Sequence, residues 1–547
     1  MKKHYEQIVR DSVSRVERSL RVQVMDPNDP AYGAFRNPEY VTEPKWTIYR
    51  LTTMCAVYLN RDTGFYHDSA LFERIMLGFA YIVRMQREDG TFDLVNCNFH
   101  AAPDTAFCVK RLMPLFRYLE AHRLDDQTET LYETVRGIIK RGAEGMARGG
   151  FHTPNHRWAI ASNLMECFDI FGEERWRARA QEYLAEGIDN NEYGEYAERS
   201  AGNYNRVNND AMITLAKRTG DHQYYEYAVK NLRMMLNYIE PDGTMFTNNS
   251  TRQDRGVKVL PRNYYLEYLE MGDMFGIPEF LDMANFIIDS ALAHGHRTPD
   301  VLMHLMAEPH LIDIEHEGCG VPAQYQQFYA ESGIARMRRG DWSYSVVEGC
   351  PGFFYFQRGA LACGLKIGVG FFEHRAFQGG ALRRTENGYI LEQTMHGWYY
   401  EPNGKAGDTT DWWKMDNAAR AKQAGPDLHL RVEIVEQEDG VDLTVTADGI
   451  DRALPRFEIA FDAPCTVEGD GFFLQGEPGK QMIAKSGMVK VSRGGDCIEV
   501  GPAFAGHHYV GGKFGSAAPS GTHFTVYFTD TTCFARTISF RARPADY

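Results

Sequence analysis

The sequence predicts an N-terminal (α/α)6 toroid followed by a C-terminal antiparallel β-sandwich. Up to about residue 310, apolar residues recur at i, i+3 and i+4, as they do between Phe107 and Leu119. This is the spacing of an amphipathic helix. After about residue 340, short stretches alternate polar and apolar residues between glycine turns. That pattern is typical of antiparallel strands.

The helical pattern occurs in twelve segments, which make six pairs. The segments are 4–24, 46–61, 68–87, 104–122, 126–147, 155–171, 173–187, 205–219, 221–239, 262–275, 278–294 and 298–308. Helix pairs that repeat along a chain stack on their neighbours and form a curved or closed array. Six such hairpins would close an (α/α)6 toroid.

Four connections between these helices are long and polar, and each begins at a glycine turn. Their glycines are Gly90, Gly150, Gly194 and Gly243, roughly 45–60 residues apart. In a toroid, alternate connections gather on one face, so the four polar connections would converge there. Loops held by a rigid scaffold are where binding and catalysis usually occur. We therefore expect the functional site on this face.

The C-terminal part consists of short strand-like stretches such as "LHLRVEIVEQ" and "VDLTVTADGI". Many closely spaced strands predict an antiparallel sandwich. We predict a catalytic toroid domain over residues 1–310, a linker over 311–340 and a β-sandwich domain over 341–547.

Composition narrows the function classes. The 547 residues carry a net charge of −15, which argues against general binding to nucleic acid or to an anionic membrane. The sequence contains no run of about 18 apolar residues, so we predict no transmembrane helix. The first twenty residues lack the apolar core of a secretory signal. We expect a cytoplasmic protein. The ten cysteines form no Cys-x-x-Cys pair, so we predict neither a metal site nor a cofactor.

The four connections are rich in amides, aromatic residues, carboxylates and a few cations. Such a surface suits a sugar, because Trp and Tyr stack on its apolar face while amides bind its hydroxyls and Arg pairs with a substrate carboxylate. The predicted substrate-binding residues of the helical part are Asn98, His100, Asn155, Arg157, Trp158, Asn205, Asn249, Arg252, Gln253 and Tyr264.

Single residues in this set have simpler explanations. Asp104 and Asn155 would each serve as the N-cap of a following helix. Glu198 would form a solvated ion pair with Arg199, and Tyr204 would fit a core position. The functional interpretation depends on the convergence of all four connections.

Two mechanisms fit these residue types. Glycoside hydrolysis needs two carboxylates that flank the bond, for which Asp104, Glu198 and Asp254 are the candidates. β-Elimination from a uronate instead needs a group that neutralises the sugar carboxylate, a base and an acid. The candidates for elimination are Asn155, His156, Tyr204 and Arg252.

The motifs "NHRW", "GNYNR" and "STRQDRG", together with the order of the two domains, resemble uronate-active carbohydrate enzymes. The layout is similar to heparinase II/III and alginate lyases and to the β-glucuronidases of glycoside hydrolase family 154. The resemblance implies that an Asn, a His and a Tyr act around the uronate, and Asn155, His156 and Tyr204 match these types.

The C-terminal part departs from the lyase pattern. Many heparinase-type lyases carry a His-rich motif in the sandwich, whereas this part of the sequence offers only isolated histidines such as His374 and His396 and the pair His507–His508. His396 and Trp398 are predicted to line a subsite over the toroid, or else to belong to an aromatic cluster at a sheet edge.

A cytoplasmic enzyme would meet short oligosaccharides, which favours exo-acting cleavage. We therefore predict a β-glucuronidase-like hydrolase that releases a terminal uronic acid from an oligosaccharide, with a polysaccharide lyase as the close alternative. A sugar epimerase and a non-catalytic glycan-binding protein remain open, as does a homo-oligomeric state.

Overall fold

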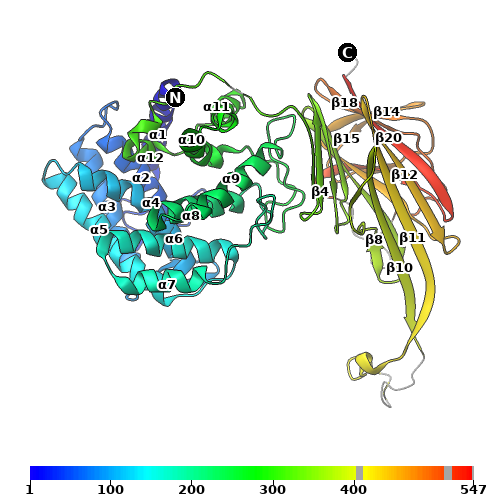
Figure 1. Cartoon of the computed structure of the whole chain (residues 1–547), viewed down its shortest axis with the longest axis horizontal. Helices are drawn as coiled ribbons and strands as arrows, with labels where there is room; N and C mark the ends of the chain where they lie inside the picture. Colours follow the sequence, from blue (N-terminus) through cyan, green and yellow to red (C-terminus); the bar gives the residue numbers. More distant parts are fainter. Residues whose placement is uncertain (319, 402–408, 410, 511–519, 545–547) are drawn as a thin grey trace. The chain divides into compact units, whose positions relative to one another are not determined.

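The computed structural model describes residues 1–318, 320–401, 409, 411–510 and 520–544. The chain forms two compact units: Met1–Leu236 with Met245–Val321, and Asn237–Thr244 with Pro322–Tyr547. The first unit is helical and the second is built of strands (Figure 1). The prediction that the N-terminal half is helical and the C-terminal half sheet-rich is confirmed.

Twelve α-helices lie in the described part of the helical unit, close to the twelve predicted segments. They are α1 (Lys2–Val22), α2 (Pro44–Leu59), α3 (Ser69–Met85), α4 (Ala102–Ala121), α5 (Asp126–Arg148), α6 (Pro154–Phe171), α7 (Glu174–Leu184), α8 (Tyr204–Thr219), α9 (Gln223–Leu236), α10 (Tyr265–Phe275), α11 (Pro278–Ala293) and α12 (Leu302–Ala307). The last helix begins later than predicted, because Asp11 accepts hydrogen bonds from both the backbone and the hydroxyl of Thr298 and holds that segment outside the helix.

Consecutive helices pack as hairpins, and alternate helices contact one another. The hairpins are α2–α3, α4–α5, α6–α7, α8–α9 and α10–α11. Helix α4 contacts both α2 and α6, α8 contacts both α6 and α10, and the short α12 packs on α2 and α4. We call α2, α4, α6, α8 and α10 the inner helices. A hairpin of β1 (Phe92–Leu94) and β2 (Asn98–Ala101) precedes α4, and the 3-10 helix η1 (Arg262–Tyr264) precedes α10.

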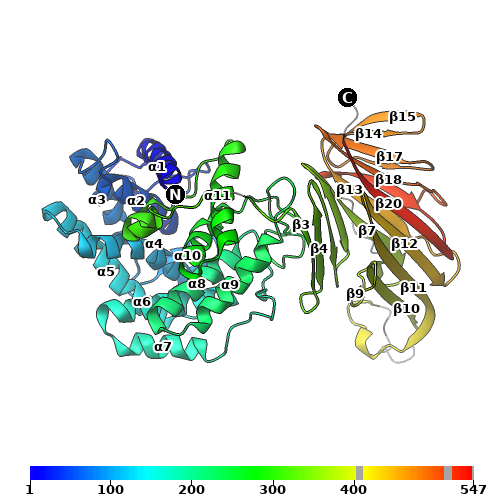
Figure 2. The ribbon, with the colours of Figure 1, turned by 45° about the horizontal axis from the view of Figure 1, so that its top comes forward.

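The described residues of the strand unit form two nine-stranded sheets. Figure 2 shows the strands of this unit. The first has the order β15 (Phe472–Gly476), β14 (Cys465–Gly469), β17 (Val489–Arg493), β18 (Asp496–Gly501), β20 (Phe534–Pro544), β12 (Gly440–Gly449), β11 (Lys422–Gln437), β10 (Gly388–Tyr400) and β9 (Arg383–Arg384). The second has the order β16 (Gln481–Ile483), β19 (His523–Thr529), β13 (Arg456–Asp462), β7 (Leu361–Phe371), β6 (Phe354–Arg358), β5 (Trp342–Val347), β4 (Ile334–Arg339) and β3 (Gln324–Tyr329), and β8 (His374–Ala376) pairs with β7.

The two sheets share one apolar core. Phe354 and Phe356 of the second sheet pack on Phe540 of the first, with ring centroids 5.1 and 6.0 Å apart. Among the described pairs the strands are antiparallel except β16 and β19. The core is built from the side chains that alternate toward it along each strand.

The predicted linker 311–340 contains β3 and β4, which belong to the second sheet. Arg336 of β4 is fully buried, with its guanidinium 2.7 Å from the Glu240 carboxylate. Glu240 lies in the segment Asn237–Thr244, which leaves the helical part of the chain and packs within the strand unit.

None of the helices among the described residues combines the length and the apolar composition that crossing a bilayer requires.

Candidate active site in the helical unit

The helical unit contains an open cavity of about 2240 Å³. Residues from all four polar connections line it, among them Asn98, His152, Asn203 and Arg252. The first turns of four inner helices meet at one end of this cavity. They contribute the first-turn cluster, which we define as Lys45 of α2, Asp104 of α4, His156 of α6 and Tyr204 of α8.

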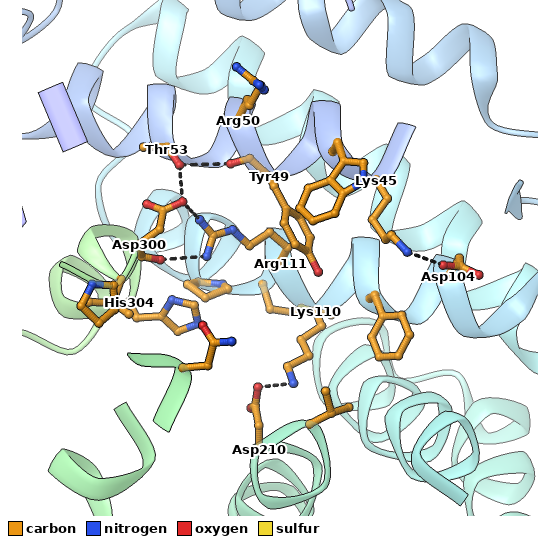
Figure 3. A pocket seen from close by; sticks show the side chains of 18 of the residues that line it. Lys45, Tyr49, Arg50, Thr53, Asp104, Lys110, Arg111, Asp210, Asp300 and His304 are labelled. Atoms are coloured by element: carbon orange, nitrogen blue, oxygen red, sulfur yellow. Dashed lines mark hydrogen bonds and ion pairs between the residues drawn. The ribbon is translucent and has the colours of Figure 1, made fainter. Parts of the chain in front are cut away.

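Lys45 and Asp104 form an ion pair across the first turns of α2 and α4 (Figure 3). The ammonium lies 2.7 Å from the carboxylate, which is 6% exposed. Burial alone would lower the pKa of Lys45, but the charge and hydrogen bond of Asp104 outweigh it and raise that pKa. Asp104 therefore lies within the first helical turn and does not serve as the N-cap, which is Ala101.

His156 is a neutral imidazole at pH 7. Burial lowers its pKa to about 4, and the charges of His152, Arg252 and Lys45 act in the same direction against Asp104. Phe107 packs against its ring at a centroid distance of 6.0 Å. His156 lines the cavity, and its Nδ1 is buried with no hydrogen-bond partner among the described residues.

Tyr204 is the first residue of α8 and contacts the fourth polar connection. The Arg252 guanidinium lies 4.9 Å from the Tyr204 ring centroid. The Tyr204 hydroxyl donates to Oε1 of Gln253 over 3.3 Å. Tyr204, Arg252 and Gln253 all line the cavity, so a phenol and a guanidinium lie together at this end.

Asn155 and Glu198 lie behind this surface and do not line the cavity. The Asn155 amide nitrogen is 2.8 Å from each oxygen of Glu198, and Arg252 Nε is 3.4 Å from Oε1 of Glu198. Burial raises the pKa of Glu198 although Asn155 and Arg252 oppose the shift. This contact joins the start of α6 to the segment before α8.

Asp254 is bound by three donors of its own unit. Its carboxylate accepts from the hydroxyls of Ser200 and Ser250 at 2.9 and 2.6 Å and from the backbone of Gly202 at 2.9 Å. It is not among the residues that line the cavity. Asp254 thus fastens the fourth connection to the third.

The remaining predicted binding residues lie in different places. Asn98 lines the cavity, 3.4 Å from His152. The others of the helical unit do not line it: His100, Arg157, Trp158, Asn205, Asn249 and Tyr264. Successive residues of an α-helix are rotated by about 100° around its axis, so Arg157 and Trp158 do not lie on the same face as His156. Arg157 pairs with Glu186, and Trp158 is fully buried.

Four more of these side chains have partners elsewhere. His100 bonds Asp89, Tyr264 donates to the Ala201 carbonyl, and Asn249 donates to Glu195. Asn205 is buried against Met235.

His396 and Trp398 belong to β10 of the strand unit. His396 lies 2.9 Å from Asp427, and the Trp398 indole donates to Glu373 at 2.7 Å.

Sequence reasoning missed a charged group deeper in the cavity (Figure 3). Lys110 pairs with Asp210, and Arg111 lies 2.6 Å from Asp300. Arg206 lies 3.6 Å from Glu267. A signal was present, because Arg206 and Asp210 are four residues apart on one face of α8 and so form a polar stripe on an inner helix.

Burial shifts the pKa of several groups in this deeper part. It lowers the pKa of Lys110, lowers that of His304 to about 3 and raises that of Glu267 to about 8. In the described part of the chain, no three His, Cys, Asp or Glu side chains gather in a way that would hold a metal ion.

No family model and no curated protein matches this chain. Solved structures are similar in fold. A xanthan lyase from Paenibacillus matches with a TM-score of 0.57 and 8% identity, over 100% of this chain and 57% of that chain. The chondroitin AC lyase of Streptomyces coelicolor A3, solved with chondroitin sulphate, matches with a TM-score of 0.54 and 11% identity, over 99% and 80%. A heparan sulfate lyase from Pedobacter heparinus matches with a TM-score of 0.50 and 11% identity, over 92% and 76%.

This chain thus spans a little more than half the length of the xanthan lyase. At such low identities the likeness concerns the fold alone.

Proposed function

We propose that this protein is a carbohydrate-active enzyme that cleaves an oligosaccharide next to a uronate by β-elimination. In this proposal the helices form an (α/α) toroid and the two sheets a β-sandwich, and the first-turn cluster with Arg252 is the catalytic site. The observation that carries the proposal is the placement of a neutral imidazole, a phenol and a guanidinium at one end of the same cavity. The similar folds of three glycan lyases support it.

Elimination requires that the proton on C5 of the uronate becomes acidic. Arg252 would bind the sugar carboxylate and stabilise the negative charge that develops on it. The first turns of α2, α4, α6 and α8 also meet here, and the partial positive charge of a helix N-terminus favours an anion. Lys45 adds a further positive charge, although Asp104 balances it.

The proton transfers follow from the protonation states. Neutral His156 accepts the C5 proton, the C4–O bond breaks, and the Tyr204 hydroxyl gives its proton to the leaving oxygen. The electron pair of the C5–H bond becomes the C4–C5 double bond. The products are an unsaturated uronate and a shorter sugar with a new hydroxyl, and no water is consumed.

Asn155 has a positioning role in this scheme. Its amide is engaged with Glu198, which also contacts Arg252. The contact sets the first turn of α6, and therefore His156, relative to the guanidinium that would bind the carboxylate.

Exo-acting hydrolysis of a terminal uronoside is the second candidate. Two observations favour it. Asp104 lines the cavity, and burial raises the pKa of Glu198, which lies in the segment before α8, as a general acid requires. Elimination is preferred because Glu198 and Asp254 do not line the cavity, whereas His156 and Tyr204 do.

The test is to supply uronate-containing oligosaccharides and to follow ultraviolet absorbance together with product mass. We expect new absorbance from the C4–C5 double bond and products whose masses sum to that of the substrate. Tyr204→Phe should lower kcat by about 10²–10⁴-fold, because it removes the acid. Tyr66→Phe, which removes a hydroxyl outside the cavity lining, is the matched control.

Products that gain one water, with no absorbance change, would establish the hydrolase instead. Full turnover by Tyr204→Phe would contradict the assigned role of Tyr204.

A further inference from the structure

A second, basic region lines the same cavity. We call it the arginine wall and define it as Arg15, Arg18 and Arg21 of α1, Arg50 of α2 and Arg262 of η1. These segments come from the beginning and the end of the helical unit. They meet because Arg15 donates to the Thr298 carbonyl and Arg262 to the Arg297 carbonyl.

The arginines of the wall form no ion pairs with the described residues. The hydrogen bonds found for these arginines go to neutral oxygens. Arg18 donates to the Ser14 carbonyl and Arg50 to the Ser19 hydroxyl, both over 3.3 Å. Nη1 of Arg15 is buried with no partner in the described part of the chain.

Asp11 and Asp300 attract Arg15 electrostatically, but their hydrogen bonds go to other groups. Asp11 accepts two hydrogen bonds from Thr298. Asp300 lies 2.6 Å from both the Arg111 guanidinium and the Thr53 hydroxyl.

Grouping these charges costs folding free energy. Burial and the neighbouring charge of Arg18 both lower the pKa of Arg50. The protein as a whole carries a charge of −15, so acidic residues to neutralise the wall would be easy to place. A cluster of unpaired guanidinium groups on a cavity wall is matched in chemistry to a bound oxyanion, which takes several charge-assisted hydrogen bonds at once.

Two exposed aromatic residues line the same cavity. Trp46 is 52% exposed and precedes Arg50 by about one helical turn on α2. Tyr40 is 78% exposed, and the Arg36 guanidinium lies 6.0 Å from its ring centroid. Aromatic faces next to guanidinium groups suit a sugar ring that bears a charged substituent.

We propose that the arginine wall is a second anion-binding subsite, which holds the sulfate or carboxylate of a sugar residue other than the one whose bond is cleaved. The substrate is then a polyanionic glycan with at least two charged residues. This inference rests on the proposed function, since it names the substrate class of the same cavity.

The first experiment measures binding alone, by calorimetry with a sulfated glucose disaccharide that contains no uronate. The Arg18→Gln/Arg50→Gln double variant should bind it at least about tenfold more weakly than the wild-type protein, because each lost hydrogen bond to a charged group contributes about 1.5–3 kcal/mol. In the described part of the chain the hydrogen bonds of both side chains go to neutral oxygens, and Arg50 also lies over the Phe35 ring. The fold should therefore persist in the double variant, which thermal melting checks.

The controls separate the wall from general charge. Arg10→Gln changes an exposed arginine of the same helix that does not line the cavity, and its affinity should equal that of the wild type. Arg18→Lys/Arg50→Lys should recover part of the affinity. The unsulfated disaccharide should bind no variant better than another. Equal affinity of the wild type and the Gln double variant would overturn the subsite.

A second experiment distinguishes this inference from the proposed function. Three tetrasaccharides share the cleaved uronate and carry a sulfate, a carboxylate or no charge on the remote residue. At least one of the two charged tetrasaccharides, the sulfated or the carboxylated, should bind to the wall. For that substrate kcat/KM should fall at least about tenfold in the Gln double variant, whereas kcat/KM for the uncharged tetrasaccharide should not change. Equal rates in both proteins would reject the subsite while elimination stands. Sulfate binding that depends on the arginines, without cleavage of any uronate glycan, would reject the proposed function and leave the subsite.

Discussion

The environment of a single side chain decides which chemistry this cavity supports. His156, Asp104 and Glu198 are all titratable and close in space. Burial keeps His156 neutral. Lys45 forms an ion pair with Asp104, and the Asn155 amide donates a hydrogen bond to Glu198. A neutral base is therefore the group most ready to accept a proton at pH 7.

The pH dependence of the reaction tests this state. The free-enzyme pKa of His156 is about 4, so the acid limb of the kcat/KM profile should have its midpoint near pH 4 and not near 6.5, the ordinary value. A midpoint near 6.5 would show that the imidazole is exposed when substrate binds, or that another group is the base.

Stability should respond to the same shift. Between pH 4 and 6.5 the unfolded chain binds a proton at this position that the folded chain does not. The contribution of His156 to stability is therefore complete above pH 6.5 and is lost as the pH falls toward 4. Urea unfolding of the wild type and of His156→Gln across this range should show a smaller pH dependence in the variant.

Side chains of residues that are adjacent in sequence can face different directions, and this limits the prediction of site residues from a motif. From the sequence alone, the motif "NHRW" predicts one binding surface. On a helix its four residues face different directions, so His156 lines the cavity while Arg157 pairs with Glu186. A motif on a helix predicts a site only for the residues that share the cavity-facing side.

At the scale of elements, the sequence predicts most of the helical unit well. The apolar spacing predicted all twelve helices, since local periodicity reports directly on which face is buried. The convergence of the four polar connections on one cavity also follows from their alternation along the chain. Strands β3 and β4 were missed, because the partner that makes a buried arginine acceptable, Glu240, is distant in sequence.

The connections themselves are held by specific contacts, and Asp254 is the clearest case. We expect Asp254→Asn to retain most of kcat, since the carboxylate does not line the cavity. The variant should unfold about 1–3 kcal/mol more easily, because one of the three donors from Ser200, Ser250 and Gly202 loses its acceptor. Urea unfolding and steady-state kinetics on the same preparation check both statements.

The matched comparison is Asp104→Asn, which changes a carboxylate that does line the cavity. A large loss of kcat in Asp254→Asn, with unchanged stability, would restore the catalytic role that the sequence alone suggested for it.

At the scale of the whole molecule, the chain order does not coincide with the two compact units. The segment Asn237–Thr244 lies between helical stretches in sequence but belongs to the strand unit. Its Glu240 accepts from Arg336 and from the Ser343 hydroxyl. The sequence predicts a helical domain up to residue 310, a linker over 311–340 and a strand domain after it. It does not predict the place of residues 237–244, since nothing local to eight residues signals that they pack with a sheet encoded much later.

The buried pair that holds this segment gives a test of its contribution to stability. Arg336→Met should destabilise the protein by about 3–5 kcal/mol, because Glu240 would stay buried with its charge uncompensated. Arg339 lies on the same strand and pairs with Glu436 at 2.7 Å, but its side chain is 29% exposed. Arg339→Met should therefore cost at most about 1 kcal/mol.

The double variant Arg336→Met/Glu240→Leu separates the charge from the packing. If the cost arises from an unpaired carboxylate, replacing both partners with apolar residues should recover most of the stability in chemical unfolding. Similar losses in Arg336→Met and Arg339→Met would show that Glu240 is hydrated, and then this ion pair would not be what attaches residues 237–244 to the strand unit.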